Sequence, residues 1–303
     1  MKSQILSLLF INSLLLAFDY KLQPEEVVSG GTHCFFGHSE VMDEHNNGDI
    51  SNSCFVNMGD TYLLIDSGST YSYAAQAHAK MKEINDLPLS YLINTHIHDD
   101  HWLGNSYYKE QGTKIIGADN FRQLPIEVTT RMQSRISKEA YKGTEQIHPS
   151  LYVEDEKILE INGKKVYIKH VNHKAHTDSD LYIYIPSQKI VFAGDLVFND
   201  RIPSIRDGSL QGWIDTLDEI RSLDVEHIVG GHGNLVTKDA LTMTYNYLVE
   251  LQSEVSRLLD EGVEIADIVN IVEMPKYKNI NLYDVMHRQN VEIAYRMLEW
   301  GDE

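Results

Sequence analysis

The sequence predicts an α+β fold in which two β-rich halves pack face to face and helices cover both outer faces, an αββα order of four layers. Three observations predict it. Short β-like runs occur in both halves of the chain, each bounded by Gly, Asn, Asp or Pro turn residues. Each group of strands is followed by sequence with a helical pattern. The last part of the chain is mostly helical in pattern.

The first half begins with three short strands and continues with alternating helices and strands. The stretch from Glu40 to Asn52 is acidic and rich in Asn and Gly, so we expect a long loop there, either a lid or a plain solvated loop. The expected strands are 32–36, 54–58, 61–65, 91–94 and 114–116, and the expected helices are 69–85, one from about 100, and 120–142.

The second half starts again with strands. The pair Asn162-Gly163 is the strongest short hairpin signal in the sequence. Residues 237–303 are predicted to form long helices without a linker of their own, so we assign 19–303 to one domain with 237–303 as a helical C-terminal extension. The expected strands are 157–161, 164–171, 181–185, 190–193 and 227–229, and the expected helix before the extension is 209–223.

The N-terminal segment is expected to be a targeting signal. Lys2 is followed by an apolar run from Ile5 to Phe18 that is short for a membrane span, and this pattern predicts a secretory signal peptide at 1–18. An uncleaved N-terminal anchor is the alternative. No later segment could span a bilayer, so after signal removal we expect no stable membrane insertion and a periplasmic or secreted protein.

Composition excludes several classes of function. The chain has 303 residues with 26 Lys and Arg against 45 Asp and Glu, a net charge of −19, which argues against nucleic-acid binding and a polybasic membrane surface. Cys34 and Cys54 are too few for a disulfide scaffold or a four-thiolate zinc site; they either form one disulfide or remain two buried thiols. A bound metal would therefore take its ligands from the 14 histidines and from carboxylates.

The most informative segment is Thr-His-Ile-His-Asp-Asp-His-Trp-Leu-Gly at 95–104. His96, His98, Asp100 and His101 are four potential metal ligands within six residues. Alternation places the first two imidazoles on one side of an extended turn, and the other two residues start a helix. One metal needs three or four such ligands, so this turn supplies half of each of two sites. A solvated polar turn is the alternative.

This motif, His-x-His-x-Asp-His, resembles the signature of the metallo-β-lactamase superfamily. The resemblance implies an αββα sandwich with extra C-terminal helices here, and further ligands at strand ends, which match His176, Asp195 and His232. By position, His96, His98 and His176 would hold one metal ion, Asp100, His101 and His232 a second, and Asp195 would bridge them. His170 and His173 fit the spacing less well than His176. The donor set suits two Zn²⁺ ions per chain, with iron or manganese chemically allowed.

The resemblance implies a hydrolase. A hydroxide held between two metal ions would attack a carbonyl-type or related electrophile: a thioester, lactam, lactone or sulfur ester. Asp100 would orient it and carry a proton to the leaving group. Asp66 matches the family's strand-end aspartate behind the ligands, although a loop-capping role is equally compatible with the sequence. The alternative functions are a non-hydrolytic, metal-binding periplasmic module and an iron-dependent oxidoreductase.

Longer segments narrow the resemblance further. Residues 47–52, 193–198, 207–213 and 288–290 resemble a branch of exported zinc metallohydrolases associated with quinoprotein and sulfur-oxidation systems. Arg201 and Arg206 follow Asp195 on a loop that should border the metals, where they would clamp an anionic group of a small-molecule substrate or would be exposed without a role. The long C-terminal helices offer a surface for a homodimer.

Overall fold

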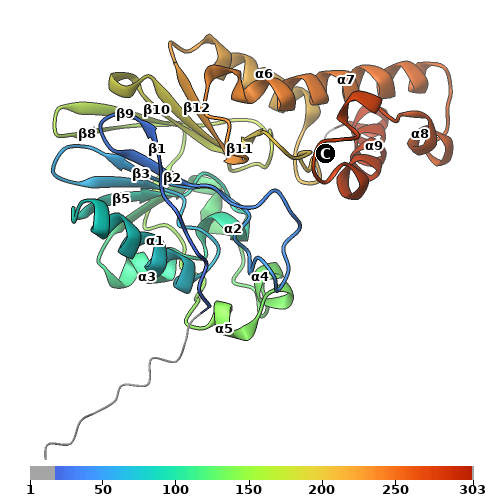
Figure 1. Ribbon diagram of the computed structural model, residues 1–303. Helices are drawn as coiled ribbons and strands as arrows, with labels where there is room; N and C mark the ends of the chain where they lie inside the picture. The colour runs from blue at the N-terminus through green and yellow to red at the C-terminus, as the bar shows by residue number, and fades with distance from the viewer. Residues whose placement is uncertain (1–17, 302–303) are drawn as a thin grey trace, which may run out of the picture.

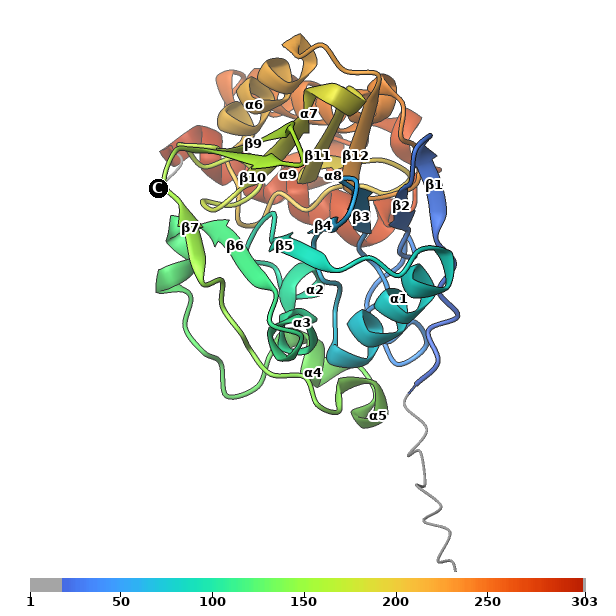
Figure 2. The ribbon, with the colours of Figure 1, turned by 90° about the vertical axis from the view of Figure 1, so that its left-hand side faces the viewer.

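The computed structural model describes residues 18–301, so the expected signal peptide lies outside the described residues apart from Phe18. The described chain forms two β-sheets that lie one above the other, with helices beyond each of them (Figures 1 and 2). This is the predicted αββα arrangement with additional C-terminal helices.

The first sheet comes from the first half of the chain. Its seven strands are β1 (Glu25–Val28), β2 (Thr32–Phe35), β3 (Ser53–Asn57), β4 (Tyr62–Ile65), β5 (Leu89–Ile93), β6 (Lys114–Ala118) and β7 (Leu151–Val153). They lie side by side in chain order, antiparallel from β1 to β4 and parallel from β4 to β7. The parallel part places the carboxyl ends of β4 and β5 at the same edge of the sheet.

The second sheet comes from the second half of the chain. Its five strands are β8 (Glu156–Ile161), β9 (Lys164–His170), β10 (Leu181–Ile185), β11 (Ile190–Phe198) and β12 (His227–His232). They lie in the order β12-β11-β10-β9-β8, and only β11 and β12 are parallel to each other. The predicted Asn162-Gly163 turn joins β8 to β9, and both of its residues have positive φ.

Helices cover the outer face of each sheet. On the first sheet lie α1 (Tyr71–Ile84), α2 (Asp99–Trp102), α3 (Asn105–Glu110), α4 (Arg131–Arg135) and α5 (Lys138–Tyr141), and on the second lie α6 (Leu210–Ser222) and α7 (Thr242–Asp260). Helix α9 (Tyr283–Trp300) packs against α7, and α8 (Ile265–Ile271) packs against α9; together they extend the molecule away from the sheets (Figure 1). Three clusters of buried apolar side chains fill the spaces between these layers.

One predicted helix is wrong. Instead of a helix over 120–142, the chain forms a short 3-10 turn at Asp119–Gln123, an irregular stretch with Pro125, and then α4 and α5. The side chains of Thr130 and Ser137 each accept a hydrogen bond from a backbone N–H and start these helices anew. The helix expected from about 100 is also divided, into α2 and α3, around Gly104, where a Cβ would lie 2.2 Å from the carbonyl oxygen of Ser67.

Two strands were missed, and β6, β11 and β12 continue beyond their predicted ends. β1 and β7 have only four and three residues and lie at the two edges of their sheet, so neither carries a strong sequence pattern. Strand β11 does not end at Ala193 as predicted but continues to Phe198, and all of its residues are buried. The extension carries Asp195 inside the strand.

Cys34 and Cys54 form a disulfide. The two residues lie opposite each other on β2 and β3, and both are buried among the apolar side chains between the sheets. The alternative of two free thiols is therefore not realised. Within residues 18–301, none of the helices has the length and apolar character needed to cross a membrane.

Candidate metal centre

The potential ligands of the first half lie where the parallel strands of the first sheet end. Strand β5 ends at Ile93, and the following turn carries His96 and His98, whereas Asp100 and His101 lie in α2. Because this short helix begins immediately after the turn, all four side chains remain at one edge of the sheet. The turn is buried except around His98, so it is not a solvated polar turn.

The ligands of the second half come from three neighbouring elements. Asp195 lies in β11 and His232 ends the parallel strand β12. His176 lies in the loop between β9 and β10, where Asp180 accepts hydrogen bonds from the backbone N–H and hydroxyl of Thr177. The ring of Trp213 from α6 packs 4.9 Å from the ring of His176. The loop and the helix together fix the position of this imidazole.

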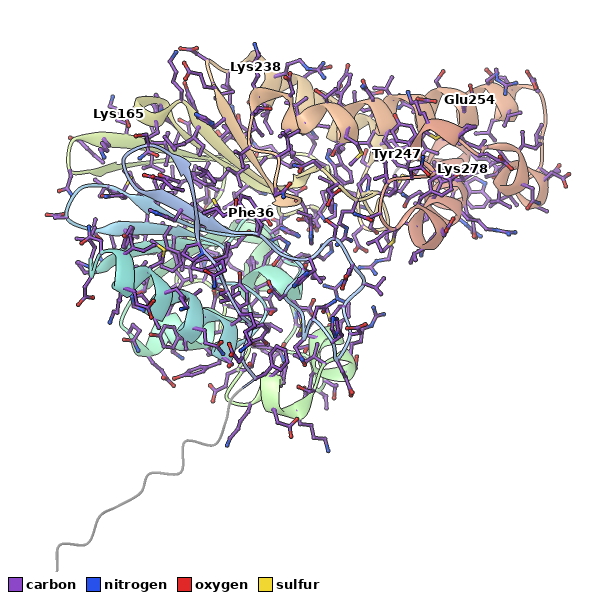
Figure 3. All side chains as sticks on the ribbon, viewed as in Figure 1. Phe36, Lys165, Lys238, Tyr247, Glu254 and Lys278 are labelled. Atoms are coloured by element: carbon purple, nitrogen blue, oxygen red, sulfur yellow. A yellow bond between two sulfur atoms is a disulfide. The ribbon has the colours of Figure 1, made fainter. Side chains whose placement is uncertain are left out.

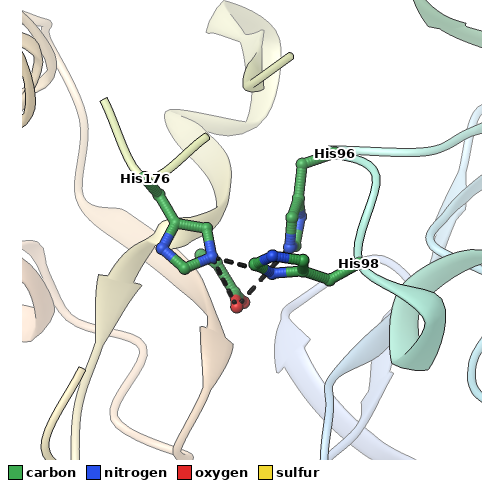
Figure 4. A group of neighbouring side chains, drawn as sticks. His96, His98 and His176 are labelled. Atoms are coloured by element: carbon green, nitrogen blue, oxygen red, sulfur yellow. Dashed lines mark hydrogen bonds and ion pairs between the residues drawn. The ribbon is translucent and has the colours of Figure 1, made fainter. Parts of the chain in front are cut away.

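Four of these residues form a first group (Figure 4). The Nε2 atoms of His96 and His176 lie 3.6 Å and 3.3 Å from Oδ2 of Asp195. The Nε2 atom of His176 also lies 3.0 Å from Nδ1 of His98. The four ligand atoms lie within 4.8 Å of one another, a spacing that one metal ion could bridge.

A second group consists of Asp100, His101 and His232. The Nε2 atoms of the two histidines lie 3.5 Å and 3.6 Å from Oδ2 of Asp100. The same nitrogens lie 3.1 Å and 3.3 Å from Oδ1 of Asp195. Asp195 therefore turns one carboxylate oxygen towards each group, as expected for a residue that bridges two metal ions.

The pattern of unsatisfied atoms fits bound cations. Nε2 of His96, Nε2 of His101 and Oδ1 of Asp195 are buried and form no hydrogen bond within the described residues. Leaving such atoms unpaired inside a protein costs free energy. A divalent cation in each group would satisfy them, and nitrogen and oxygen donors of this kind suit zinc, iron or manganese. The residues present therefore fit the metals that the sequence motif implies.

Asp66 lies directly behind the second group. Its carboxylate accepts hydrogen bonds from the backbone N–H and the hydroxyl of Thr95 and from Nδ1 of His101, each 2.8 Å long. Asp66 follows β4 with a φ of 55°, in the left-handed region that Asp tolerates better than most residues. The structure places this carboxylate behind His101, where its hydrogen bond orients the imidazole.

Asp207 orients a histidine of the first group, as Asp66 does for the second. The sequence did not identify this role. Oδ2 of Asp207 lies 3.0 Å from Nε2 of His98, so that Nδ1 of this ring faces the other ligands. Burial opposes ionisation of Asp207, but hydrogen bonds from His98 and Arg206 outweigh it and hold the pKa of this carboxyl below its usual value. In the sequence, the only indication of a role for Asp207 was that it begins the segment 207–213, which resembles one branch of the family.

Arg131 is a second residue that the sequence did not identify. Its Nη2 donates to Oδ1 of Asp100 at 2.6 Å and its guanidinium also binds Asp99. Burial would favour protonation of Asp100, but His101 and Arg131 outweigh this and hold the pKa of the carboxyl far below its usual value. Asp100 is therefore ionised, with Oδ1 held by Arg131 and Oδ2 facing the two histidines.

The two arginines proposed as substrate contacts differ in their surroundings. Arg201 is 7% exposed and lines a cavity of about 320 Å³ beside both groups. Arg206 is exposed and forms an ion pair with Asp207. The second half of the loop 40–52 is buried, and the carbonyl oxygen of Ile50 lies 2.5 Å from Nδ1 of His232, so this part is not a plain solvated loop.

The histidines rejected as ligands have other partners. Nδ1 of His170 bonds the carbonyl oxygen of Glu154 at 2.8 Å. Nε2 of His173 lies 3.0 Å from the carbonyl oxygen of Gly212. Neither residue belongs to a ligand group within the described chain.

Comparison with curated proteins identifies hydrolases. The chain is 20% identical over 259 residues to a linear primary-alkylsulfatase from a Pseudomonas species, covering 71% of this chain and 48% of the relative, so it spans about half of that protein. It is 24% identical over 213 residues to a hydroxyacylglutathione hydrolase from Pelagibacter ubique, covering 67% of this chain and 79% of the relative.

Comparison with solved structures identifies the same fold. A metallo-beta-lactamase from Pontibacter korlensis matches with a TM-score of 0.57 and 18% identity over 75% of this chain and 98% of that one. The FIM-1 metallo-beta-lactamase from Pseudomonas aeruginosa in its mono-zinc form matches with a TM-score of 0.58 and 19% identity over 76% of this chain and 95% of that one. At these identities the likeness establishes the fold alone.

The family model described as the metallo-beta-lactamase superfamily matches residues 46–232, which is more than half of the chain and includes all seven potential ligands. The narrower resemblance to an exported branch stays a prediction. The chain belongs to the metallo-beta-lactamase superfamily.

Proposed function

We propose that the protein is a metal-dependent hydrolase with a dinuclear zinc centre. His96, His98 and His176 would hold one ion, Asp100, His101 and His232 the other, and Asp195 would bridge them. The observation that carries the proposal is the position of Asp195, whose two carboxylate oxygens face the two groups separately. Two relatives that are themselves hydrolases by name support it.

Bound zinc ions would supply Lewis acidity and a water of lowered pKa. The protein's own residues orient the reaction. Arg131 holds Oδ1 of Asp100 and leaves Oδ2 facing His101 and His232, so the carboxylate is fixed where it would bind the second ion and orient the attacking water. Asp66 and Asp207 hold the rings of His101 and His98 with the ligand nitrogens turned inwards.

The substrate class follows from the chemistry of such a site. A polarised carbonyl or sulfur centre with a leaving group is the expected target, so we propose a thioester, lactam, lactone or sulfur ester. The alkylsulfatase and the hydroxyacylglutathione hydrolase act, by their names, on a sulfate ester and a thioester. Both lie within this range.

Metal analysis and a substrate screen test the proposal. The purified protein should contain about two zinc ions per chain and hydrolyse at least one member of the four substrate classes. Asp100→Asn should lose hydrolysis while it remains folded. A folded wild type with less than one metal per chain would contradict the dinuclear centre. Normal metal content without hydrolysis of any tested ester, thioester or lactam would favour a binding module instead.

We also propose that the protein is exported, to the periplasm or beyond. The buried disulfide between Cys34 and Cys54 supports this, because disulfides persist mainly in oxidising compartments. Cell fractionation followed by N-terminal sequencing tests it. Mature protein outside the cytoplasm that begins near residue 18 is the expected result, whereas a cytoplasmic protein that retains Met1 would contradict it.

A further inference from the structure

The cavity beside the metal groups has two different kinds of wall. One wall consists of the ligands His98, His176, Asp195 and His232 with Asp100. The rest of the lining includes Val285, Met286 and Gln289 of α9, Val41 of the loop 40–52, and the arginines Arg131, Arg135, Arg201 and Arg206. Val285 and Val41 are 53% and 42% exposed. The family match ends at residue 232, so α9 lies outside the matched part of the chain.

Arg201 is a buried cation without an anionic partner. No carboxylate lies within ion-pair distance of its guanidinium in the described part of the chain, and its Nε is buried without a hydrogen bond. Its Nη1 lies 3.3 Å from Nδ1 of His232. That nitrogen must itself donate to the carbonyl oxygen of Ile50, 2.5 Å away, so it offers Arg201 no lone pair.

The other charges around the cavity do not neutralise Arg201. Arg131 is paired with Asp99 and Asp100, and Arg206 is paired with Asp207. Arg135, the remaining arginine of the lining, is exposed and adds a further positive charge. The carboxylates that attract Arg201 most are Asp195 and Asp100, and both belong to the metal groups. Bound cations would take up the charge of these carboxylates, which would leave the guanidinium without an anion, beside the ring of Phe198, whose centroid lies 5.6 Å from Cζ of Arg201. A buried, uncompensated charge is costly unless a ligand pairs with it.

The C-terminal helices hold the loop that carries Arg201. Arg201 forms a β-bridge with Asn281, and the N–H of Ile202 donates to the carbonyl oxygen of Asn281 at 2.9 Å. The side chain of Asn290 on α9 donates to the carbonyl oxygen of Pro203 at 2.8 Å.

Asn290 is itself held in place. Asn290 is 1% exposed, and its Nδ2 also donates to the hydroxyl of Tyr247 at 2.9 Å. Tyr247 belongs to α7 and lies between this helix and α9 (Figure 3). This hydroxyl in turn lies 3.0 Å from Nδ1 of His287. A network of buried polar groups therefore couples α7 and α9 to the loop, and α9 both forms a wall of the cavity and fixes its charged residue.

We propose that this cavity binds an organic oxyanion, with Arg201 pairing with the charged group and α9 contacting the carbon skeleton. The ligand class is a sulfate, sulfonate or carboxylate attached to a short apolar chain, because a buried guanidinium without an ion pair shares the cavity with the apolar side chains of Val41, Val285 and Met286. Asn290 is a positioning residue that acts through the loop 199–208. This inference rests on the proposed hydrolase, for which it makes the substrate an anion.

Binding to the zinc-loaded full-length protein tests the inference without measuring hydrolysis. Hexanesulfonate and hexanoate serve as anionic probes and hexanol as the neutral probe in titration calorimetry. Arg201→Gln removes the charge, Arg201→Lys restores it without the forked geometry, and Asn290→Ala removes the link to α9. Arg288→Gln is the matched control, because Arg288 is an exposed arginine on α9 that does not line the cavity.

Arg201→Gln should weaken the binding of at least one anion roughly 10-fold or more, since a buried charge-assisted pair is lost. Arg201→Lys should recover part of this loss, and Asn290→Ala should weaken the same anion with its zinc content unchanged. Arg288→Gln should bind like wild type, and hexanol should bind weakly to every variant.

Three results would overturn the inference: hexanol binding as tightly as the anions, equal anion binding by wild type and folded Arg201→Gln, or equal losses in Arg288→Gln and Arg201→Gln. If Arg201→Gln does not fold, Arg201→Lys and Asn290→Ala decide by the same comparison. Anion binding without hydrolysis of any substrate would contradict the hydrolase alone. Faster hydrolysis by wild type of a neutral substrate than of its anionic counterpart would contradict the anionic substrate alone.

Discussion

Asp66 and His101 are joined by a hydrogen bond of 2.8 Å between a carboxylate oxygen and Nδ1 of the imidazole. The bond determines which ring nitrogen carries the proton and turns the other towards Asp195, 3.1 Å away. A carboxylate behind a ligating histidine also raises the basicity of the ring. The strand end at Ile65 and the helix start at Asp99 therefore contribute jointly to one ligand.

Asp66→Asn should lower zinc affinity at the second group by roughly 10-fold to 100-fold, because the amide cannot accept as strongly from His101. Asn tolerates the positive φ at this position, so the backbone should be preserved. Competition with a zinc chelator measures the affinity. Asp260→Asn, at an exposed position near the end of α7, is the control. Unchanged zinc affinity in folded Asp66→Asn would contradict the assigned role.

Asp207→Asn should weaken the first group instead, by a comparable factor, because His98 loses its orienting carboxylate. In stepwise chelation one zinc ion should leave this variant earlier than in wild type, and the second should leave at an unchanged chelator concentration. Equal weakening of both ions would show that Asp207 supports the whole loop rather than His98.

Asp49 should make stability depend on pH. It is 6% exposed, and burial raises its pKa to about 7, whereas an unfolded aspartate titrates near 3.9. Between these two pKa values the folded protein binds a proton that the unfolded chain has released. The contribution of protonated Asp49 to stability is therefore full below about pH 4, falls as the pH rises, and is lost above about pH 7.

Asp49→Asn mimics the protonated carboxyl at every pH. It should raise the free energy of unfolding by roughly 2–4 kcal/mol at pH 8, since each unit of pKa shift corresponds to about 1.4 kcal/mol. Denaturant unfolding should show a smaller gain at pH 5 than at pH 8. Equal gains at both pH values would mean that the effect does not come from ionisation.

The disulfide should stabilise the fold without contributing to the metal site. It closes a segment with a sequence separation of 20, for which a stabilisation of about 2–4 kcal/mol is typical. The double variant Cys34→Ala/Cys54→Ala should lose about this amount in denaturant unfolding and keep its zinc. A matching loss in wild type under reducing conditions, with none in the variant, would confirm the origin; zinc loss in the folded variant would contradict it.

The ligand residues could be predicted because the signal is local. His96, His98, Asp100 and His101 lie within six residues of sequence, and the other three lie in or next to apolar strands. The residues behind the ligands were harder to identify. Asp207 lies in an irregular loop, and Arg131 begins the short helix α4 after an irregular stretch, so no periodic pattern encodes their positions. Asp66 was found only because it follows a strand immediately.

The roles of Arg201 and Arg206 could not be separated from the sequence. Both follow Asp195 on the same loop, yet one is buried and unpaired while the other is exposed beside Asp207. The difference is created by Asn281 and Asn290, which lie about 80 residues further along the chain. Contacts over such separations depend on tertiary packing, which local patterns do not report. The helix predicted over 120–142 does not form for a simpler reason: Pro125 interrupts it, and Thr130 caps a new helix.

The division of the ligand residues between the two halves of the chain affects how the fold assembles. The first half of the chain carries four of the seven ligand residues and the second half carries three, so neither half has both complete groups. The metal centre forms only after the two sheets have packed together. Bound cations would then link ligands from both halves and stabilise the interface between the sheets. Separately produced halves of the chain should therefore associate more tightly when zinc is present. During folding, zinc binding would report when the two halves pack together.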